Sequence, residues 1–551
     1  MLIRPARLAP LLAMLTLAAC RSSAPADLVV FGPVWTADSL APRAQGVAVR
    51  GDSIIAVGDS ATIAALIGPA TERIDNPDGL VMPGFIDDHV HLATGGHQLS
   101  NVDLRDAATP EEFIRRIGAF AKTRPPGSWI LRGTWDHELW PGAPLPDRSW
   151  IDSVTPDHPV FVTRLDGHMS LANSAALRAA GLDRSMRDIP GGEIVRRRDG
   201  ELTGMFKDAA MSAVRAAIPA TTSAELDSIV ARALRHAASV GVTSIASVSS
   251  SWADIAALRR ARANGTLTLR VASYLPLEDW RTAADSLRAA GPGDEWLRVA
   301  GVKGFVDGSL GSTTAYFDAP FSDAPATSGF LVHPADSLRR WITAADSAGL
   351  QVVVHAIGDR ANGLLLDLFD EAARANGPRD RRFRIEHAQH IRPVDLPRFA
   401  ALGVIPSMQP YHAADDGRWA EKRIGPERIK TTYAFRSLLD AKARLVFGSD
   451  WTVAPLEPML GVKAAVTRQT IDGRDVFVPE ERITVEEALR AYTVDNAYAM
   501  YLDQVVGRLA VGMRADLVVL NRDPFVIPAD QLEQIRPRAT VVAGRVVYRA
   551  P

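Results

Sequence analysis

The stretch Met82-Pro83-Gly84-Phe85-Ile86-Asp87-Asp88-His89-Val90-His91-Leu92 decides the fold of this chain. A short apolar run with a Pro-Gly turn predicts a strand, in which successive side chains point to opposite faces. His89 and His91 therefore share one face, and two imidazoles held by a rigid strand can bind one metal ion. His-x-His alone also fits a histidine in a hydrogen-bond network beside an incidental one, so the rest of the chain has to decide.

Length and composition predict a large globular protein. A chain of 551 residues is too long for one small core, which favours a large domain with an accessory one. Hydrophobic residues make up 47% and charged residues 23%, enough to bury a core, and this excludes a disordered protein. The net charge of -2 provides no basic surface, so nucleic acid and anionic membrane surfaces are not expected as electrostatic partners.

The first twenty residues predict export. Two arginines precede an apolar run over residues 8–19, which is too short to span a bilayer and is typical of a secretory signal. Leu17-Ala18-Ala19-Cys20 resembles the lipobox of bacterial lipoproteins, which implies a signal peptide over residues 1–20, a lipid on Cys20 and anchoring in the bacterial cell envelope, on the periplasmic or surface face. The alternative is a plain signal peptide cut near Ala19 and a secreted periplasmic protein. Cys20 is the only cysteine, so no intramolecular disulfide and no thiolate ligand are available.

The middle of the chain, residues 81–503, alternates strand-like runs with helical segments. Such alternation predicts βα units, a parallel sheet and hence an α/β fold, the (β/α)8 barrel, whose catalytic side chains project from the C-terminal ends of the strands. The expected strands are 81–91, 242–248, 269–275, 299–306, 351–355, 383–387, 404–408 and 445–450, with helices such as 224–239, 361–375 and 486–500.

Two further regions surround this barrel. Residues 27–80 and 504–551 consist of short β-rich segments and turns, and we expect both chain ends to form one small β-sandwich domain. An insertion over about residues 93–219 leaves the barrel directly after the first strand, which predicts a lid that contributes substrate contacts. The alternative is a structural cover without a ligand role.

Polar residues follow several of the expected strands. Strand one ends in the two histidines, strands five and six end in His355 and His387, strand eight ends in Asp450, and strand four carries Lys303. All of these positions lie where a barrel presents its active site. A single buried histidine is often a structural group. Polar residues at the ends of five expected strands are unlike a coincidence and indicate one shared site.

These residues resemble a known family. Met82–His91 is similar to the first-strand motif of the amidohydrolase superfamily, in particular the amidohydrolase 3 group, which includes proteins like N-substituted formamide deformylase. Further similar stretches are Lys303–Ser312, His355–Ala361, Ile385–His387, Phe447–Trp451 and Ala515–Leu520, and the resemblance spans residues 27–548. Two positions depart from the pattern: Asp88 replaces the common serine before the first histidine, and Thr313 replaces an arginine often found there.

The resemblance implies a two-metal site. His89 and His91 would bind one ion, His355 and His387 the other, and Lys303 would bridge them as a carbamate. Asp450 would bind the first ion and hold the attacking water, which would become a bridging hydroxide. A lysine ammonium has no lone pair, so Lys303 can belong to the site only when it is deprotonated or carboxylated. If it is neither, the alternative is an ordinary salt bridge near Asp307. Imidazole and carboxylate ligands favour Zn(II), with Mn(II), Co(II) or Fe(II) as alternatives.

The expected function is metal-dependent hydrolysis of C–N bonds in small amides of the N-acyl or N-formyl amine type. Hydrolysis of esters, lactones or dipeptides at the same site is an alternative, and a non-catalytic solute-binding lipoprotein is an alternative of another class. The oligomeric state stays open. Five residues are candidates for substrate contacts: His168 in Asp166-Gly167-His168, Trp135, His137, Gln409 and Trp451. The alternative is that they are core or surface residues.

Overall fold

A computed structural model describes residues 24–551 of the chain. The predicted signal peptide and Cys20 lie outside the described residues. Between residues 24 and 551, no helix combines the length and the hydropathy that crossing a membrane requires.

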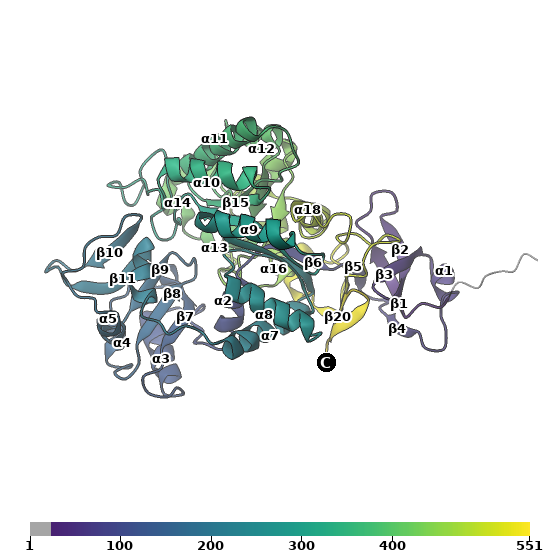
Figure 1. Ribbon diagram of the computed structural model, residues 1–551, viewed down its shortest axis with the longest axis horizontal. Helices are drawn as coiled ribbons and strands as arrows, with labels where there is room; N and C mark the ends of the chain where they lie inside the picture. Colours follow the sequence, from purple (N-terminus) through teal and green to yellow (C-terminus); the bar gives the residue numbers. More distant parts are fainter. Residues whose placement is uncertain (1–23) are drawn as a thin grey trace, which may run out of the picture.

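The central body is the predicted (β/α)8 barrel, and this prediction is confirmed (Figure 1). Eight parallel strands follow one another around the sheet in chain order: β6 (Phe85–Val90), β12 (Val242–Ser247), β13 (Arg270–Pro276), β14 (Leu297–Phe305), β15 (Gln351–Ala356), β16 (Arg384–His387), β17 (Ile405–Met408) and β18 (Val446–Phe447). The seam between β18 and β6 is bridged by two backbone hydrogen bonds, from Asp450 N to His89 O and from His91 N to Trp451 O. The C-terminal ends of the first and last strands therefore meet.

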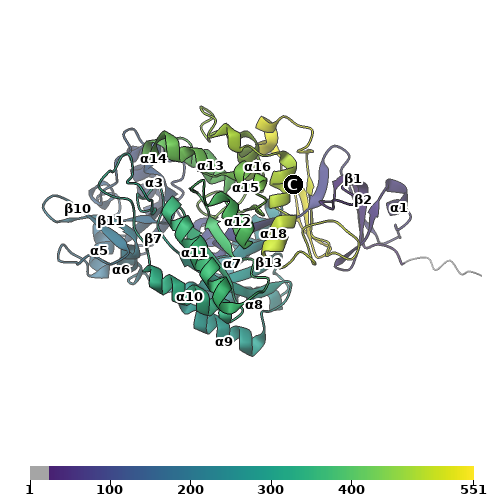
Figure 2. The same ribbon diagram turned by 90° about the horizontal axis from the view of Figure 1, so that it is seen from above.

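Helices cover the outside of the barrel (Figure 2). They include α7 (Ser223–Ser239), α8 (Trp252–Ala263), α9 (Trp280–Ala290), α10 (Ala335–Ser347), α11 (Asp359–Asn376), α12 (Leu396–Leu402), α15 (Phe435–Asp440), α16 (Pro458–Thr467), α17 (Val485–Ala491) and α18 (Val494–Ala499). A capping box of Thr222 and Glu225 starts α7, because each side chain accepts a backbone N–H that the first turn leaves free. The helix expected over residues 486–500 is broken between α17 and α18, where Thr493 leaves the helical conformation.

The expected first strand is two strands, which corrects the sequence prediction. β5 (Leu80–Pro83) pairs with strands from the chain ends, and only β6 belongs to the barrel. The break falls at Gly84, where a Cβ atom would lie 2.2 Å from Thr243 Cγ2 of the neighbouring strand. Only glycine permits this close approach, so the chain can pass from one sheet to the other there.

Both ends of the chain contribute to one eight-stranded sheet at one end of the molecule. Its strands are β1 (Leu28–Trp35), β2 (Arg43–Arg50), β3 (Ser53–Gly58), β4 (Glu72–Asp75), β5, β19 (Leu517–Leu520), β20 (Pro537–Val542) and β21 (Arg545–Arg549), with the short helix α1 (Ser60–Ala64) beside them. Val47 from β2 and Val541 from β20 belong to the same buried cluster, so strands far apart in the sheet share a core. Arg270 donates to Asp516 at 2.7 Å and fastens the barrel to this sheet.

The insertion lies at the opposite end of the molecule (Figures 1 and 2). After α2 (Leu92–Gln98) it contains α3 (Pro110–Ala121), α4 (Ser149–Asp152), α5 (Ser174–Ala180) and α6 (Ser212–Arg215) around a five-stranded sheet of β7 (Ile130–Trp135), β8 (Val160–Arg164), β9 (Met169–Ala172), β10 (Gly192–Arg196) and β11 (Leu202–Asp208). It has its own buried aromatic and aliphatic cluster. The loops at the barrel side of its sheet reach the mouth of the barrel, as the next section describes.

Candidate metal centre

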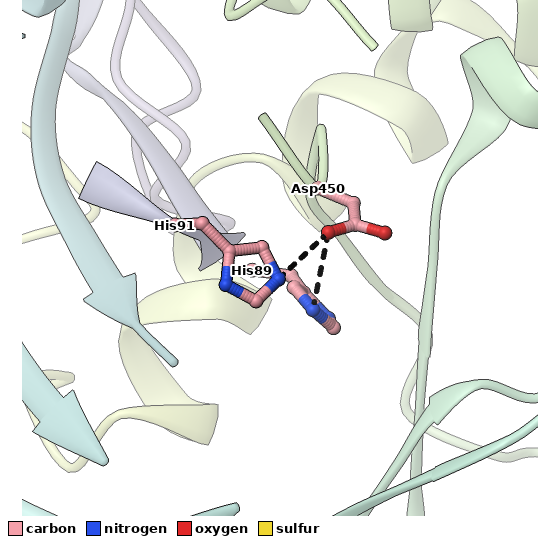
Figure 3. Close-up of side chains that lie close together, drawn as sticks. All are labelled: His89, His91 and Asp450. Atoms are coloured by element: carbon pink, nitrogen blue, oxygen red, sulfur yellow. Dashed lines mark ion pairs between the residues drawn. The ribbon is translucent and has the colours of Figure 1, made fainter. Parts of the chain in front are cut away.

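Three predicted ligands meet at the C-terminal end of the barrel (Figure 3). The Nε2 atoms of His89 and His91 lie 3.5 and 3.2 Å from Oδ1 of Asp450. Their ligand atoms form a group in which all members lie within 4.8 Å of one another. The two histidines flank the end of β6 and Asp450 follows β18, so closure of the barrel is what brings them together.

The carboxylate of Asp450 is buried, with the imidazole nitrogens of His89 and His91 beside its Oδ1 atom. Among residues 24–551, its Oδ1 atom has no hydrogen-bond partner. Burial lowers the pKa of His89 to about 4, so its imidazole is neutral at neutral pH. Its proton lies on Nδ1, which donates to Glu386 Oε2 at 2.5 Å. The lone pair of His89 Nε2 thus faces a carboxylate oxygen, an arrangement that a cation between them would stabilise.

A buried network holds His89 in this orientation. Glu386 also accepts from Arg384 Nε at 2.8 Å and from Ser407 Oγ at 2.6 Å. Burial alone would raise the pKa of Glu386, but the guanidinium of Arg384 and the imidazole of His89 hold it well below its usual range. A carboxylate behind a metal-binding histidine fixes the tautomer and increases the basicity of the free nitrogen.

Two more predicted ligands have one ring nitrogen occupied in the same way. His387 donates from Nδ1 to Gln409 Oε1 at 2.7 Å, and His355 donates from Nε2 to the carbonyl oxygen of Gly308 at 3.0 Å. Each ring therefore keeps one free lone pair, on Nε2 of His387 and on Nδ1 of His355. The two ring centroids are 4.5 Å apart.

Lys303 lies under the histidines at the end of β14. Its Nζ atom is 3.4 Å from His89 Nε2 and 4.8 Å from the centroid of the Phe305 ring. Burial lowers the pKa of Lys303 to about 8, because an ammonium group is poorly solvated there. The structure thus places Lys303 beside the histidines, and Asp307, its alternative partner, instead accepts backbone N–H groups of Ile357 and Gly358.

The structure adds a residue that the sequence interpretation missed. His412, in α13 (Pro410–Asp416), forms a second group with His387 and Asp450, again with ligand atoms within 4.8 Å of one another. Asp450 is common to both groups. The sequence signal was weak because His412 follows β17 by four residues and lies in a helix rather than at a strand end.

Of the predicted substrate contacts, His168 lines the pocket at the barrel mouth together with His355, His387 and Asp450. Its Nδ1 atom lies 2.5 Å from Asp208 Oδ1, and its ring is 5.1 Å from that of His355. Burial opposes protonation, but the carboxylate of Asp208 raises the pKa of His168.

The other four candidates do not line this pocket, and the alternative of core residues fits Trp135 and Trp451. Trp135 is fully buried in the core of the insertion, stacks on Trp140 and donates to Val162 O at 3.0 Å. The indole of Trp451 packs against Gly95 of α2 and lies 5.1 Å from the ring of His236, while its backbone forms a bridge with Val90.

Gln409 and His137 hold other side chains and do not line the pocket. Gln409 is fully buried behind His387. His137 accepts from Arg164 Nε at 3.2 Å, and Arg164 itself does line the pocket.

A buried ion-pair network attaches the insertion to the barrel mouth. Arg164 donates to Asp136 and to Asp166, each at 2.7 Å. Asp166 in turn accepts from Ser309 Oγ at 2.6 Å, in the loop after β14, and Asp136 accepts from Arg418 at 3.2 Å. The insertion therefore forms one wall of the pocket.

The sequence matches the family model described as "Amidohydrolase family" over residues 72–548. The chain belongs to the amidohydrolase family.

Relatives of this amidohydrolase cover nearly its full length. Protein LONG AFTER FAR-RED 3 of Arabidopsis thaliana is 39% identical over 95% of this chain and 92% of its own length. N-substituted formamide deformylase of Arthrobacter pascens is 28% identical over 95% of this chain and 98% of its own. A crystal structure of a metal-dependent hydrolase from Pyrococcus horikoshii superposes with a TM-score of 0.74 at 30% identity and covers 91% of this chain and 99% of its own.

The residues at the mouth of this amidohydrolase fit a divalent metal ion. Neutral imidazoles with one free nitrogen and an unpaired carboxylate oxygen are the donors that Zn(II) and similar ions prefer. The oriented rings of His89 and His387 and the orphaned Oδ1 atom of Asp450 support this assignment. The amidohydrolase is therefore a hydrolase with a candidate metal-binding site built from histidine and aspartate.

Proposed function

We propose that this chain hydrolyses C–N bonds in small amides, of the N-acyl or N-formyl amine type, at a site for two metal ions. The observation that carries the proposal is the position of Asp450, whose carboxylate is common to two groups of buried ligands. The similarity to N-substituted formamide deformylase supports the choice of amides. Since a barrel hosts many reactions, the substrate class rests on this relative and on the chemistry of the site.

Two divalent ions, with Zn(II) favoured by the donors, would lower the pKa of a water molecule and polarise the substrate carbonyl. Asp450 accepts the proton of the attacking water and passes it to the leaving amine. A C–O bond forms and the C–N bond breaks, so the products are a carboxylic acid and an amine. Glu386 and Gln409 hold His89 and His387 in place throughout.

Lys303 carries a carbamate in this proposal. Its lowered pKa, about 8, leaves a fraction of neutral amine at neutral pH, and only the neutral amine can combine with carbon dioxide. The resulting carbamate is an anion beside the ligands of both groups. The test is to measure the masses of the intact wild-type protein and of Lys303→Ala under native conditions. After correction for the substitution, the wild-type protein should be heavier by the mass of one carbon dioxide.

His168 contacts the substrate from the insertion side. Asp208 holds its Nδ1 atom, so Nε2 is turned to the pocket and can hydrogen-bond the carbonyl oxygen or the leaving nitrogen. We expect His168→Asn to raise KM or lower kcat without changing metal content, because His168 belongs to neither ligand group.

The test of function is product analysis by mass spectrometry. Metal-loaded protein is incubated with N-formyl amines, N-acyl amino acids, dipeptides and esters, and Asp450→Asn serves as the blank. Cleavage confined to amides, absent from the blank, is the expected result. Cleavage of esters alone, or of nothing despite full metal occupancy, would remove the amide assignment.

We also propose that Cys20 anchors the chain in the bacterial envelope by a lipid. The support is the lipobox-like sequence before it and the lack of any other cysteine. The chain is expected in the membrane fraction of a bacterial host, and Cys20→Ser in the soluble or uncleaved fraction. An unmodified Cys20 in a soluble chain would contradict the anchor.

A further inference from the structure

His412 is buried at the barrel mouth with an unused ring nitrogen. Its side chain is 8% exposed, and its Nε2 atom has no hydrogen-bond partner in the described part of the chain. Pro410 starts α13 directly after β17, and the backbone N–H of His412 donates to Gln409 O at 3.0 Å. A buried imidazole nitrogen without a partner is costly unless a ligand occupies it.

The surroundings of His412 indicate what that ligand is. Its nitrogen, the ligand nitrogen of His387 and a carboxylate oxygen of Asp450 all lie within 4.8 Å of one another. The rings of His387 and His412 are nearly parallel, at 15°, with centroids 6.2 Å apart. These three atoms all offer lone pairs, and none of them is a hydrogen-bond donor to the others. Such a group is suited to binding a cation.

His355 does not belong to this group of ligand atoms. Its Nε2–H is held by the carbonyl oxygen of Gly308, so only Nδ1 can bind an ion. The imidazole that completes the group with His387 and Asp450 is that of His412, which lies in α13 and not on a barrel strand.

We propose that His412 is a direct ligand of the second metal ion, together with His387 and Asp450. The inference rests on the proposed two-metal site but not on any substrate. Binding of the second ion would then depend on α13, the helix that also contributes Asp415 and Asp416 to the pocket wall. The first position, at His89 and His91, does not depend on it.

Metal binding to the full chain tests the inference. Purified protein is equilibrated with Zn(II), and ions per chain and affinities are measured by elemental analysis and chelator competition. Wild type is expected to bind two ions, and His412→Asn to keep the first ion and bind the second at least about tenfold more weakly. His390→Asn is the matched control, because His390 is also buried but is held by Thr432 Oγ1 at 2.8 Å, outside both groups.

A cysteine at the same position gives a readout that a structural role would not produce. In the Cys20→Ser background the chain has no other thiol. His412→Cys loaded with Co(II) is expected to show a new sulfur-to-cobalt charge-transfer band, since a thiolate is a good ligand for such ions. Unchanged affinity in His412→Asn, a single ion in wild type, or a folded His412→Cys without the band would each overturn the inference. Because no substrate is used, a failure of the amide assignment would leave these results unaffected.

Discussion

The mouth of the barrel and the core of the insertion bury their polar atoms in opposite ways. In the insertion, the indole nitrogens of Trp135 and Trp140 donate to backbone carbonyls at 3.0 and 2.8 Å, and the rings stack on one another. At the mouth, Oδ1 of Asp450 and Nε2 of His412 are buried without partners in the part of the chain that the structure describes. Residues of both regions are buried, but the two indole nitrogens have partners whereas these two atoms at the mouth do not.

Backbone strain occurs in both regions, at Arg132 and Thr134 of β7 as well as at the mouth of the barrel. His387 and Asp450 have φ values of 72° and 54°, a region that non-glycine residues rarely adopt and that costs roughly 1–3 kcal/mol per residue. His387 is the last residue of β16, and Asp450 lies three residues after the end of β18. Burial or strain by itself therefore does not distinguish structural residues from functional ones, and what distinguishes the mouth is that the ligand atoms of His387, His412 and Asp450 lie within 4.8 Å of one another.

The largest effect is expected at the carboxylate that both ligand groups share. Asp450→Asn keeps the shape of the side chain but removes the negative charge and the proton acceptor. We expect kcat/KM to fall by roughly 10²–10⁴-fold, the range for a lost general base, with little change in the unfolding temperature. The measurement compares wild type and variant on the same amide at equal metal content, and retained turnover would contradict the role of Asp450.

The second effect belongs to the insertion core. Trp135→Ala leaves a large cavity, so the free energy of unfolding should fall by about 3–5 kcal/mol in denaturant titrations, with KM unchanged. Trp252→Ala is the matched control, because Trp252 is 38% exposed and its loss should cost less than about 0.5 kcal/mol. A raised KM with unchanged stability in Trp135→Ala would restore its predicted contact with substrate.

The sequence predicted the barrel because strand and helix periodicities alternate strongly, and it placed His89 and Asp450 together because parallel strands end at one edge. It could not predict that Gly84 divides the first strand, since this depends on the proximity of Thr243. It also left open whether Trp135 lines the pocket or belongs to a core, because distance along the chain from a strand end does not reveal which core a side chain enters. The metal identity, the carbamate and the lipid anchor stay predictions.

A third effect tests the support behind the metal ligands. Glu386→Gln removes the charge that holds His89 through a 2.5 Å hydrogen bond, so affinity for the first ion should fall by about 10–100-fold. Chelator competition measures this directly. Glu481→Gln is the matched control, because Glu481 is also buried but accepts from the backbone N–H of Ser437, away from the ligands. Equal affinities in the two variants would show that the network serves stability alone.

The smallest effect distinguishes two roles of Gln409. Its amide oxygen accepts from His387 Nδ1 at 2.7 Å, and a neutral acceptor holds an imidazole about half as strongly as a carboxylate does. Gln409→Ala should therefore weaken only the second ion, near the tenfold end of that range, and kcat/KM should recover at saturating metal. If the affinity for metal is unchanged while KM rises at full occupancy, Gln409 contacts the substrate, and the pocket extends behind His387 rather than ending at it.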